Sequence, residues 1–80
     1  MSKRFACPCC GFLTLATLGE YEVCPVCFWE DQTDCALKPD ELSEANGLSL
    51  SQARLHFNRY GACEPGLAAH VRLPLPHELP

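Results

Sequence analysis

The chain has 80 residues, of which 48% are hydrophobic, and its formal net charge at pH 7 is −4. A chain of this length forms one small domain, whose hydrophobic core is marginal unless a metal ion or another crosslink stabilises it. The apolar fraction excludes a disordered tail, and the negative charge, without any run of basic residues, argues against nucleic acid as a partner.

The first residues and the cysteine count indicate the compartment. Met1 to Ala6 has no apolar h-region of a signal peptide, and no apolar run of the chain approaches membrane-spanning length. Seven cysteines are an odd number, which disfavours a secreted disulfide scaffold. We therefore expect a cytoplasmic protein with reduced thiols and no membrane partner.

Two Cys-Pro-x-Cys motifs carry the strongest functional signal. Cys7 and Cys10 form the first, and Cys24 and Cys27 form the second. Two residues between the cysteines let a tight turn direct both sulfurs at one ion, and two such turns supply the four soft ligands of a tetrahedral zinc or iron site. Cys9 also lies within the first motif, but the two-residue gap favours Cys7 as the partner of Cys10 and leaves Cys9 a free thiol.

The segment between the motifs predicts a β-hairpin. Residues 12–15 and 21–23 are short β-prone runs, and Gly19 can supply a positive φ in the turn at 16–20. Such a hairpin would carry a motif at each end and bring the two together, which is the architecture of a zinc ribbon.

The next residues predict an aromatic anchor and a short helix. Phe28 and Trp29 directly follow the second motif, where they would shield the metal site or anchor the next segment. Pro39 begins a run typical of a first helical turn, and Asn46 with Gly47 would end that helix. Cys35, in an unpatterned context, is interpreted as a small buried hydrophobe, and so is Cys63.

Residues 49–60 predict the main helix. Ser49 and Gln52 fit a capping box, and Gly61 stands at the position that follows a helix end. Leu55 projects away from the core-facing side. That apolar side consists of residues at helical spacing, Leu50, Ala53, Phe57 and Tyr60.

Residues 63–80 form a Pro-rich tail in which apolar and other residues alternate from Val71 to Pro76, and we expect it to be extended along a surface. The predicted fold class is therefore small α+β. Residues 1–62 form a zinc ribbon followed by one main C-terminal α-helix, and the extended tail at 63–80 packs on this domain or projects from it.

Three runs of sequence, C-P-C-C-G at 7–11, G-E-Y-E-V-C-P-V-C-F-W-E-D at 19–31 and A-N-G-L-S-L-S-Q-A-R-L-H-F at 45–57, resemble the bacterial cysteine-rich CPCC family. The resemblance extends from about Phe5 to Gly61. It implies a small zinc-binding protein and no defined activity. The ligands that it implies are the four motif cysteines, Cys7, Cys10, Cys24 and Cys27.

Three functions fit these observations. The first is a structural zinc module acting through protein–protein contacts made by Trp29, Leu55 and the tail, with another protein or a second copy as partner, because a filled Cys₄ site has no open position for catalysis. The second is a small hydrolase using Glu30, Asp31 and Arg54, or His56, around a cleft between the ribbon and the helix. In the alternative structural role, Arg54 would pair with Glu30 or Asp31. The third is a rubredoxin-like iron electron carrier. Our expectation leans towards a protein that is not an enzyme.

Overall fold

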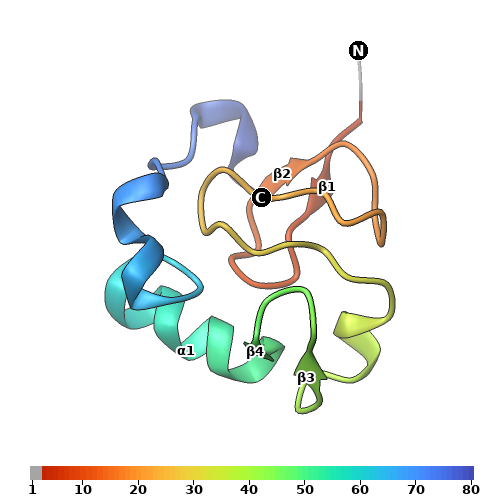
Figure 1. The fold of residues 1–80 in the computed structure, drawn as a ribbon. Helices are drawn as coiled ribbons and strands as arrows, with labels where there is room; N and C mark the ends of the chain where they lie inside the picture. Colours follow the sequence, from red (N-terminus) through yellow and green to blue (C-terminus); the bar gives the residue numbers. More distant parts are fainter. Residues whose placement is uncertain (1–2) are drawn as a thin grey trace.

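The computed structural model describes residues 3–80 (Figure 1). Its regular structure consists of two small antiparallel sheets and one α-helix. In chain order the elements are β1 (Phe5–Ala6), β2 (Leu13–Leu15), β3 (Leu42–Ser43), β4 (Leu48–Ser49) and α1 (Leu50–Tyr60), and short 3₁₀ segments cover Cys35–Leu37, Pro65–His70 and Pro76–Glu78. The fold belongs to the small α+β class predicted from the sequence.

The first Cys-Pro-x-Cys motif forms the turn of a hairpin. β1 pairs antiparallel with β2, so that Phe5 lies opposite Leu15. The N–H of Cys7 donates to the carbonyl of Phe12 at 2.9 Å, and the N–H of Gly11 donates to the carbonyl of Cys7 at 2.8 Å. These two bonds close the turn and hold both cysteines of the motif on it.

The second motif repeats this arrangement. Val23 and Glu30 form an antiparallel bridge on either side of the turn. The N–H of Cys24 donates to the carbonyl of Trp29 at 2.9 Å, and the N–H of Phe28 donates to the carbonyl of Cys24 at 2.8 Å. The two motifs are therefore equivalent units, bonded at the same sequence offsets.

Both turns need a left-handed residue after the second cysteine. Gly11 follows Cys10 with a φ of 82°, and Phe28 follows Cys27 with a φ of 69°. Glycine adopts this conformation without steric cost, whereas a phenylalanine in it costs about 1 kcal/mol or more. Because the same backbone shape recurs despite that cost, the turn geometry is imposed by the motif and not by local preference.

The predicted pairing of residues 12–15 with residues 21–23 is wrong. The β-prone run at 13–15 is a strand, but it pairs with β1 and not across the intermotif turn. Backbone N–H groups of that turn are bonded by a side chain instead: Glu22 Oε1 accepts from Ala16 at 2.9 Å and from Thr17 at 3.2 Å. Each motif therefore closes a short hairpin of its own, and a short closure costs less entropy than a long one.

The predicted short helix at 39–46 is also wrong. Residues 42–43 and 48–49 pair as β3 and β4, and the turn between them contains Asn46 and Gly47. The Asn46 side chain accepts from the N–H of Glu30 and donates to its carbonyl, both at 2.8 Å. Gly47 has a φ of 76° and donates its N–H to the carbonyl of Ser43. The Asn-Gly pair thus marks a hairpin turn that is bonded to the second motif.

The main helix is confirmed. Ser49 and Gln52 form the capping box, and Gly61 ends α1 with a φ of 78°. Leu50 and Ala53 are buried and Phe57 is half-buried, whereas Leu55 is 69% exposed, as predicted. Tyr60 was predicted to face the core but is 46% exposed. Tyr60 is exposed because the last turn of α1 extends beyond the small core, and its ring lies 6.0 Å from that of His56.

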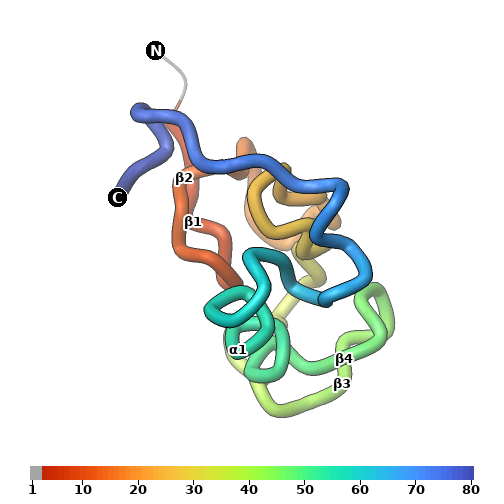
Figure 2. Tube along the Cα trace, turned by 90° about the vertical axis from the view of Figure 1, so that its left-hand side faces the viewer, coloured from red at the N-terminus to blue at the C-terminus, as the bar shows by residue number. Residues whose placement is uncertain are grey.

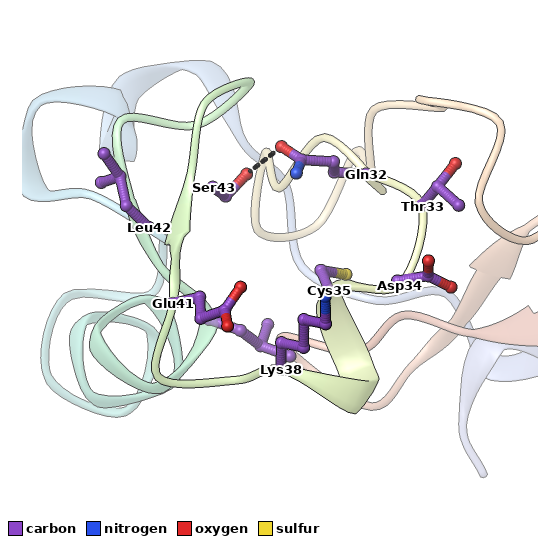
Figure 3. A pocket seen from close by; sticks show the side chains of 9 residues that line it. Gln32, Thr33, Asp34, Cys35, Lys38, Glu41, Leu42 and Ser43 are labelled. Atoms are coloured by element: carbon purple, nitrogen blue, oxygen red, sulfur yellow. Dashed lines mark hydrogen bonds between the residues drawn. The ribbon is translucent and has the colours of Figure 1, made fainter.

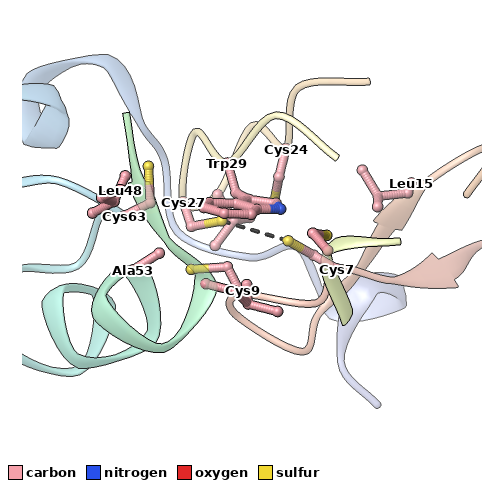
Figure 4. Close-up of a cluster of buried hydrophobic side chains, with 12 residues drawn as sticks. Cys7, Cys9, Leu15, Cys24, Cys27, Trp29, Leu48, Ala53 and Cys63 are labelled. Atoms are coloured by element: carbon pink, nitrogen blue, oxygen red, sulfur yellow. Dashed lines mark hydrogen bonds between the residues drawn. The ribbon is translucent and has the colours of Figure 1, made fainter. Parts of the chain in front are cut away.

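Cysteines make up much of the core (Figure 4). Trp29 is its largest fully buried side chain and is 0% exposed, so it anchors the core and takes no part in an exposed surface. Its indole N–H has no hydrogen-bond acceptor among residues 3–80, which is a cost of that burial. The other buried apolar side chains include Leu15, Val26, Leu50 and six of the cysteines, Cys7, Cys9, Cys24, Cys27, Cys35 and Cys63.

The tail packs against the domain (Figure 2). Cys63 is buried and its N–H donates to the carbonyl of Cys27 at 2.8 Å, and the N–H of Arg72 donates to the carbonyl of Pro25 at 3.1 Å. The 3₁₀ segment Pro76–Glu78 contacts β2. The prediction of an extended tail holds between the two 3₁₀ segments but is wrong within them. Within residues 3–80 no helix is long and apolar enough to cross a membrane.

Candidate metal centre

The structure brings the sulfurs of the four motif cysteines together. All four Sγ atoms lie within 4.8 Å of one another. Contacts run between the motifs: Cys7 Sγ lies 3.5 Å from Cys27 Sγ, and Cys10 Sγ lies 3.7 Å from Cys24 Sγ. Four sulfurs bound to Zn²⁺ at about 2.3 Å in a tetrahedron would be about 3.8 Å apart. The cluster therefore has the size and the ligand set of a site that can bind a metal ion.

Burial of the cluster is uneven. Cys7, Cys24 and Cys27 are buried, whereas Cys10 is half-buried. The core covers the cluster on the side of Trp29 and the tail covers Cys27 through its contact at Cys63. Solvent therefore reaches the cluster mainly at Cys10.

Close packing of the four thiols makes their pKa values differ from one another. Interactions with Cys10, Cys27 and Cys7, in that order, lower the pKa of Cys24 far below its usual value, because the neighbouring thiols donate to its sulfur. The pKa of Cys10 is raised, first by Cys24, and the pKa of Cys7 is raised, first by Cys10. One thiolate is thus favoured in the cluster, and further ionisation requires a cation to offset the repulsion between like charges.

Thr14 is a contact of the cluster that the sequence analysis missed. Its Oγ1 lies 3.0 Å from Cys24 Sγ, and the residue is buried on β2. The hydroxyl can donate to the thiolate and so lowers the pKa of Cys24. Strand alternation gave the only available signal, because it placed Thr14 on one face with Phe12, but it left open which face was buried.

The remaining cysteines lie outside the four-sulfur cluster. Cys9 is buried and is not one of the residues that meet at the candidate site. In Figure 4 its side chain lies between the first motif and Ala53 of α1. Burial, and then Cys9, raises the pKa of Cys63 to about 12. Burial also raises the pKa of Cys35. Cys35 and Cys63 are therefore protonated at neutral pH, and they pack as small apolar groups.

Arg54 does not pair with Glu30 or Asp31 as predicted; its Nε donates to the carbonyl of Pro8 at 2.9 Å. This bond ties α1 to the first motif. Asp31 is buried, accepts from the N–H of Gly19 at 2.7 Å through Oδ2, and lies 3.6 Å from Cys35 Sγ through Oδ1. The Asp31 carboxylate thus holds the intermotif turn, where Gly19 has the expected positive φ, 71°.

Cavities near these residues do not assemble the predicted hydrolytic cluster. The cavity in Figure 3 has a volume of about 150 Å³ and is lined by residues 32–35 with Lys38, Glu41, Leu42, Ser43 and Leu50. A neighbouring hollow of about 390 Å³ includes Asp31 among its lining residues. Neither is lined by Glu30 or Arg54. The geometry thus gives the three residues separate structural contacts.

Comparison with known protein families matches most of the chain. The family model described as Cysteine-rich CPCC matches residues 5–78. The match extends beyond the predicted limit at Gly61 and includes most of the tail, in keeping with the contacts between the tail and the second motif. No curated protein matches the sequence.

Proposed function

The chain belongs to the cysteine-rich CPCC family, and on that premise we propose that it is a structural zinc-binding module that acts through protein–protein contacts. The observation that carries the metal part is the meeting of four thiols from two equivalent turns within 4.8 Å. Zinc suits such a set because it accepts four thiolates in a tetrahedron. Cys7, Cys10, Cys24 and Cys27 are the proposed ligands.

Bound zinc would supply a crosslink between two weak hairpins. The strands of the first hairpin are two and three residues long, and a single bridge closes the second. Such short pairings do not persist alone in water. Metal binding to structural cysteine sites contributes roughly 10 kcal/mol or more to folding. In this proposal the ion therefore decides whether the two motifs stay together.

A contact function suits the rest of the molecule better than catalysis does. Four thiolates complete the coordination of zinc and leave no open position for a substrate. Leu55, Leu73 and Leu75 are exposed apolar side chains that a partner could cover. The partner would be another protein or a second copy of the chain, and the net charge of −4, or about −6 with a zinc tetrathiolate, disfavours nucleic acid.

The proposed location is the cytoplasm. All seven cysteines are free thiols, the state that a reducing compartment maintains. A zinc-thiolate site depends on that state, because oxidation of the ligands to disulfides removes the thiolates.

Metal analysis of protein purified without chelators tests the proposal. We expect one zinc per chain, lost in Cys24→Ser and retained in Cys9→Ser, because Cys9 lies outside the cluster. Iron in place of zinc, visible as colour, would favour the electron carrier. Absence of both metals, or loss of metal in Cys9→Ser with retention in Cys7→Ser, would contradict the ligand assignment.

A further inference from the structure

The outward side of α1 forms a continuous surface of its own. Five residues spaced along two helical turns line a groove of about 390 Å³: Gln52, Leu55, His56, Arg59 and Tyr60. We refer to these five residues as the outer face. Gln52, Leu55 and Arg59 lie on the side of the helix opposite Leu50 and Ala53, which are buried in the core, whereas Tyr60 lies at the edge of that core-facing side. In Figure 1, α1 lies at the edge of the fold.

Leu55 and Tyr60 supply apolar surface at the two sides of the outer face. Leu55 is 69% exposed and Tyr60 is 46% exposed. The ring of His56 lies 6.0 Å from that of Tyr60, and its Nδ1 is directed to the carbonyl of Cys63 at 3.0 Å, which fixes the imidazole. Leu55 lines the same groove as this aromatic pair, an arrangement that can receive an apolar side chain.

Gln52 and Arg59 supply hydrogen-bond donors between these two apolar side chains, and no carboxylate is among the residues that line the groove. Gln52 Oε1 already accepts from the N–H of Ser49, so the amide nitrogen of Gln52 is the group left to interact outward. Among residues 3–80 the one ion pair joins Arg72 to Glu78, so Arg59 keeps an uncompensated charge. Helix α1 contains two arginines and no acidic residue, although the whole chain is acidic.

We propose that the outer face docks an acidic segment of another protein, which places an apolar side chain against Leu55 and a carboxylate against Arg59. This inference rests on the proposed contact function and specifies its partner by charge complementarity. A symmetric contact between two copies through this face would oppose Arg59 to like charge with no carboxylate available. A nucleic acid needs several cationic contacts to its phosphates, whereas the groove offers one arginine beside an exposed leucine, which suits a single carboxylate next to an apolar side chain.

Selection from a phage-displayed library of random 16-residue peptides tests the proposal, with the zinc-loaded chain as target. We expect enrichment of peptides that combine Asp or Glu with Leu or an aromatic residue. Leu55→Glu should weaken the affinity of the chain for a selected peptide roughly tenfold or more. Arg59→Glu should reverse the charge of the peptides that are selected, and binding by the native chain should weaken as salt rises. Leu37→Glu, at an exposed leucine in the 3₁₀ segment Cys35–Leu37, is the matched control and should bind like the native chain.

Several outcomes would overturn the proposal. In the selection, these are no enrichment, or enrichment of basic or uncharged peptides. In binding assays, it is peptide binding that survives Leu55→Glu. A dimer in sedimentation that Leu55→Glu dissociates would favour a second copy as partner, and binding of a random 20-nucleotide single strand that Arg59→Glu abolishes would favour a nucleic acid. Metal content of the same preparations separates the two proposals. Zinc-loaded protein that selects no peptide refutes docking alone, whereas peptide selection by protein without zinc refutes the zinc module alone.

Discussion

Individual side chains set the properties of the candidate metal centre. Thr14 shows this most directly. Its buried hydroxyl lies 3.0 Å from the sulfur of Cys24, and this is the one cluster sulfur to which it is hydrogen-bonded. A hydrogen bond to a metal-bound thiolate spreads its charge and fixes its direction. The site is therefore asymmetric, with a supported sulfur at Cys24 and a partly solvent-exposed one at Cys10.

Replacing Thr14 by valine should weaken metal binding. The variant keeps the shape of the side chain but removes the donor to Cys24, so we expect zinc affinity to fall roughly tenfold. Competition with a chromophoric chelator measures the change. Thr14→Ser, which retains a hydroxyl, is the control and should stay close to the native affinity. If the native chain and the valine variant bind zinc with equal affinity, Thr14 does not contribute to metal binding.

Glu78 should make stability depend on pH in the acid range. Arg72 donates to both of its carboxylate oxygens at 2.8 Å, and Arg72 foremost lowers the pKa of Glu78 from 4.5 to about 2. A lowered pKa stabilises the fold above pH 4.5, and this contribution disappears as the pH falls towards 2. The native chain should thus be more stable than Glu78→Gln at pH 7.

The Glu78 prediction is tested by unfolding both proteins in denaturant across this pH range. The comparison covers the pH range in which both proteins still bind zinc, because loss of the ion would disturb the fold of both. Within that range the difference between their unfolding free energies should begin to shrink as the pH approaches 4.5, and equal stabilities of the two proteins at pH 7 would contradict the assigned role of the ion pair.

At the scale of elements, α1 is held in position by one buried face, one hydrogen bond and one aromatic contact. Leu50 and Ala53 are buried in the core, and the Arg54 side chain reaches the carbonyl of Pro8 in the first motif. Phe57 adds an edge-to-face contact with Phe12, whose ring centroid lies 6.2 Å away. An isolated helix of this length is marginal in water. Its contacts with the first hairpin therefore stabilise it.

Truncating Phe57 should loosen this junction. Because the ring is half-buried, Phe57→Ala should lower the free energy of unfolding by about 2 kcal/mol, less than the loss for a fully buried ring. Chemical denaturation of the zinc-loaded protein measures it. Leu55→Ala, on the exposed side of the same helix, should change stability by less than about 0.5 kcal/mol. Equal losses in the two variants would mean that the helix packs through a different face.

At the scale of the whole molecule, one small core joins all of the segments. The backbone N–H of Cys63 in the tail donates to the carbonyl of Cys27. The Asn46 side chain in the β3–β4 turn is hydrogen-bonded to the backbone of Glu30, and the Arg54 side chain donates to the carbonyl of Pro8. Each of these contacts is to a cysteine motif or, at Glu30, to the residue that closes the second hairpin by bridging to Val23. Loss of the proposed ion should therefore disturb the whole fold and not the motifs alone.

Metal removal should expose the single tryptophan. Trp29 is 0% exposed beside the cluster, so stripping zinc with a chelator should shift its fluorescence emission to longer wavelength, and added zinc should restore it. Cys24→Ser should show the shifted emission without chelator, and Cys9→Ser should not. Unchanged emission from protein shown to be metal-free would mean that the core holds without the ion.

The sequence by itself determined the features that depend on local chemistry. The spacing of Cys7, Cys10, Cys24 and Cys27 anticipated which sulfurs meet, because a Cys-Pro-x-Cys turn fixes its own geometry. The capping box and Gly61 bounded the helix, because both signals act within one helical turn.

Only the tertiary structure decided which segments lie together. It paired β2 with β1, made Asn46 a link to the second motif, turned Arg54 to Pro8 and left Tyr60 at the surface. Each of these outcomes depends on a partner distant in sequence or on where a small core ends. Local preference carries no information about either, since backbone and side-chain groups bond to whichever partner the folded chain brings within reach.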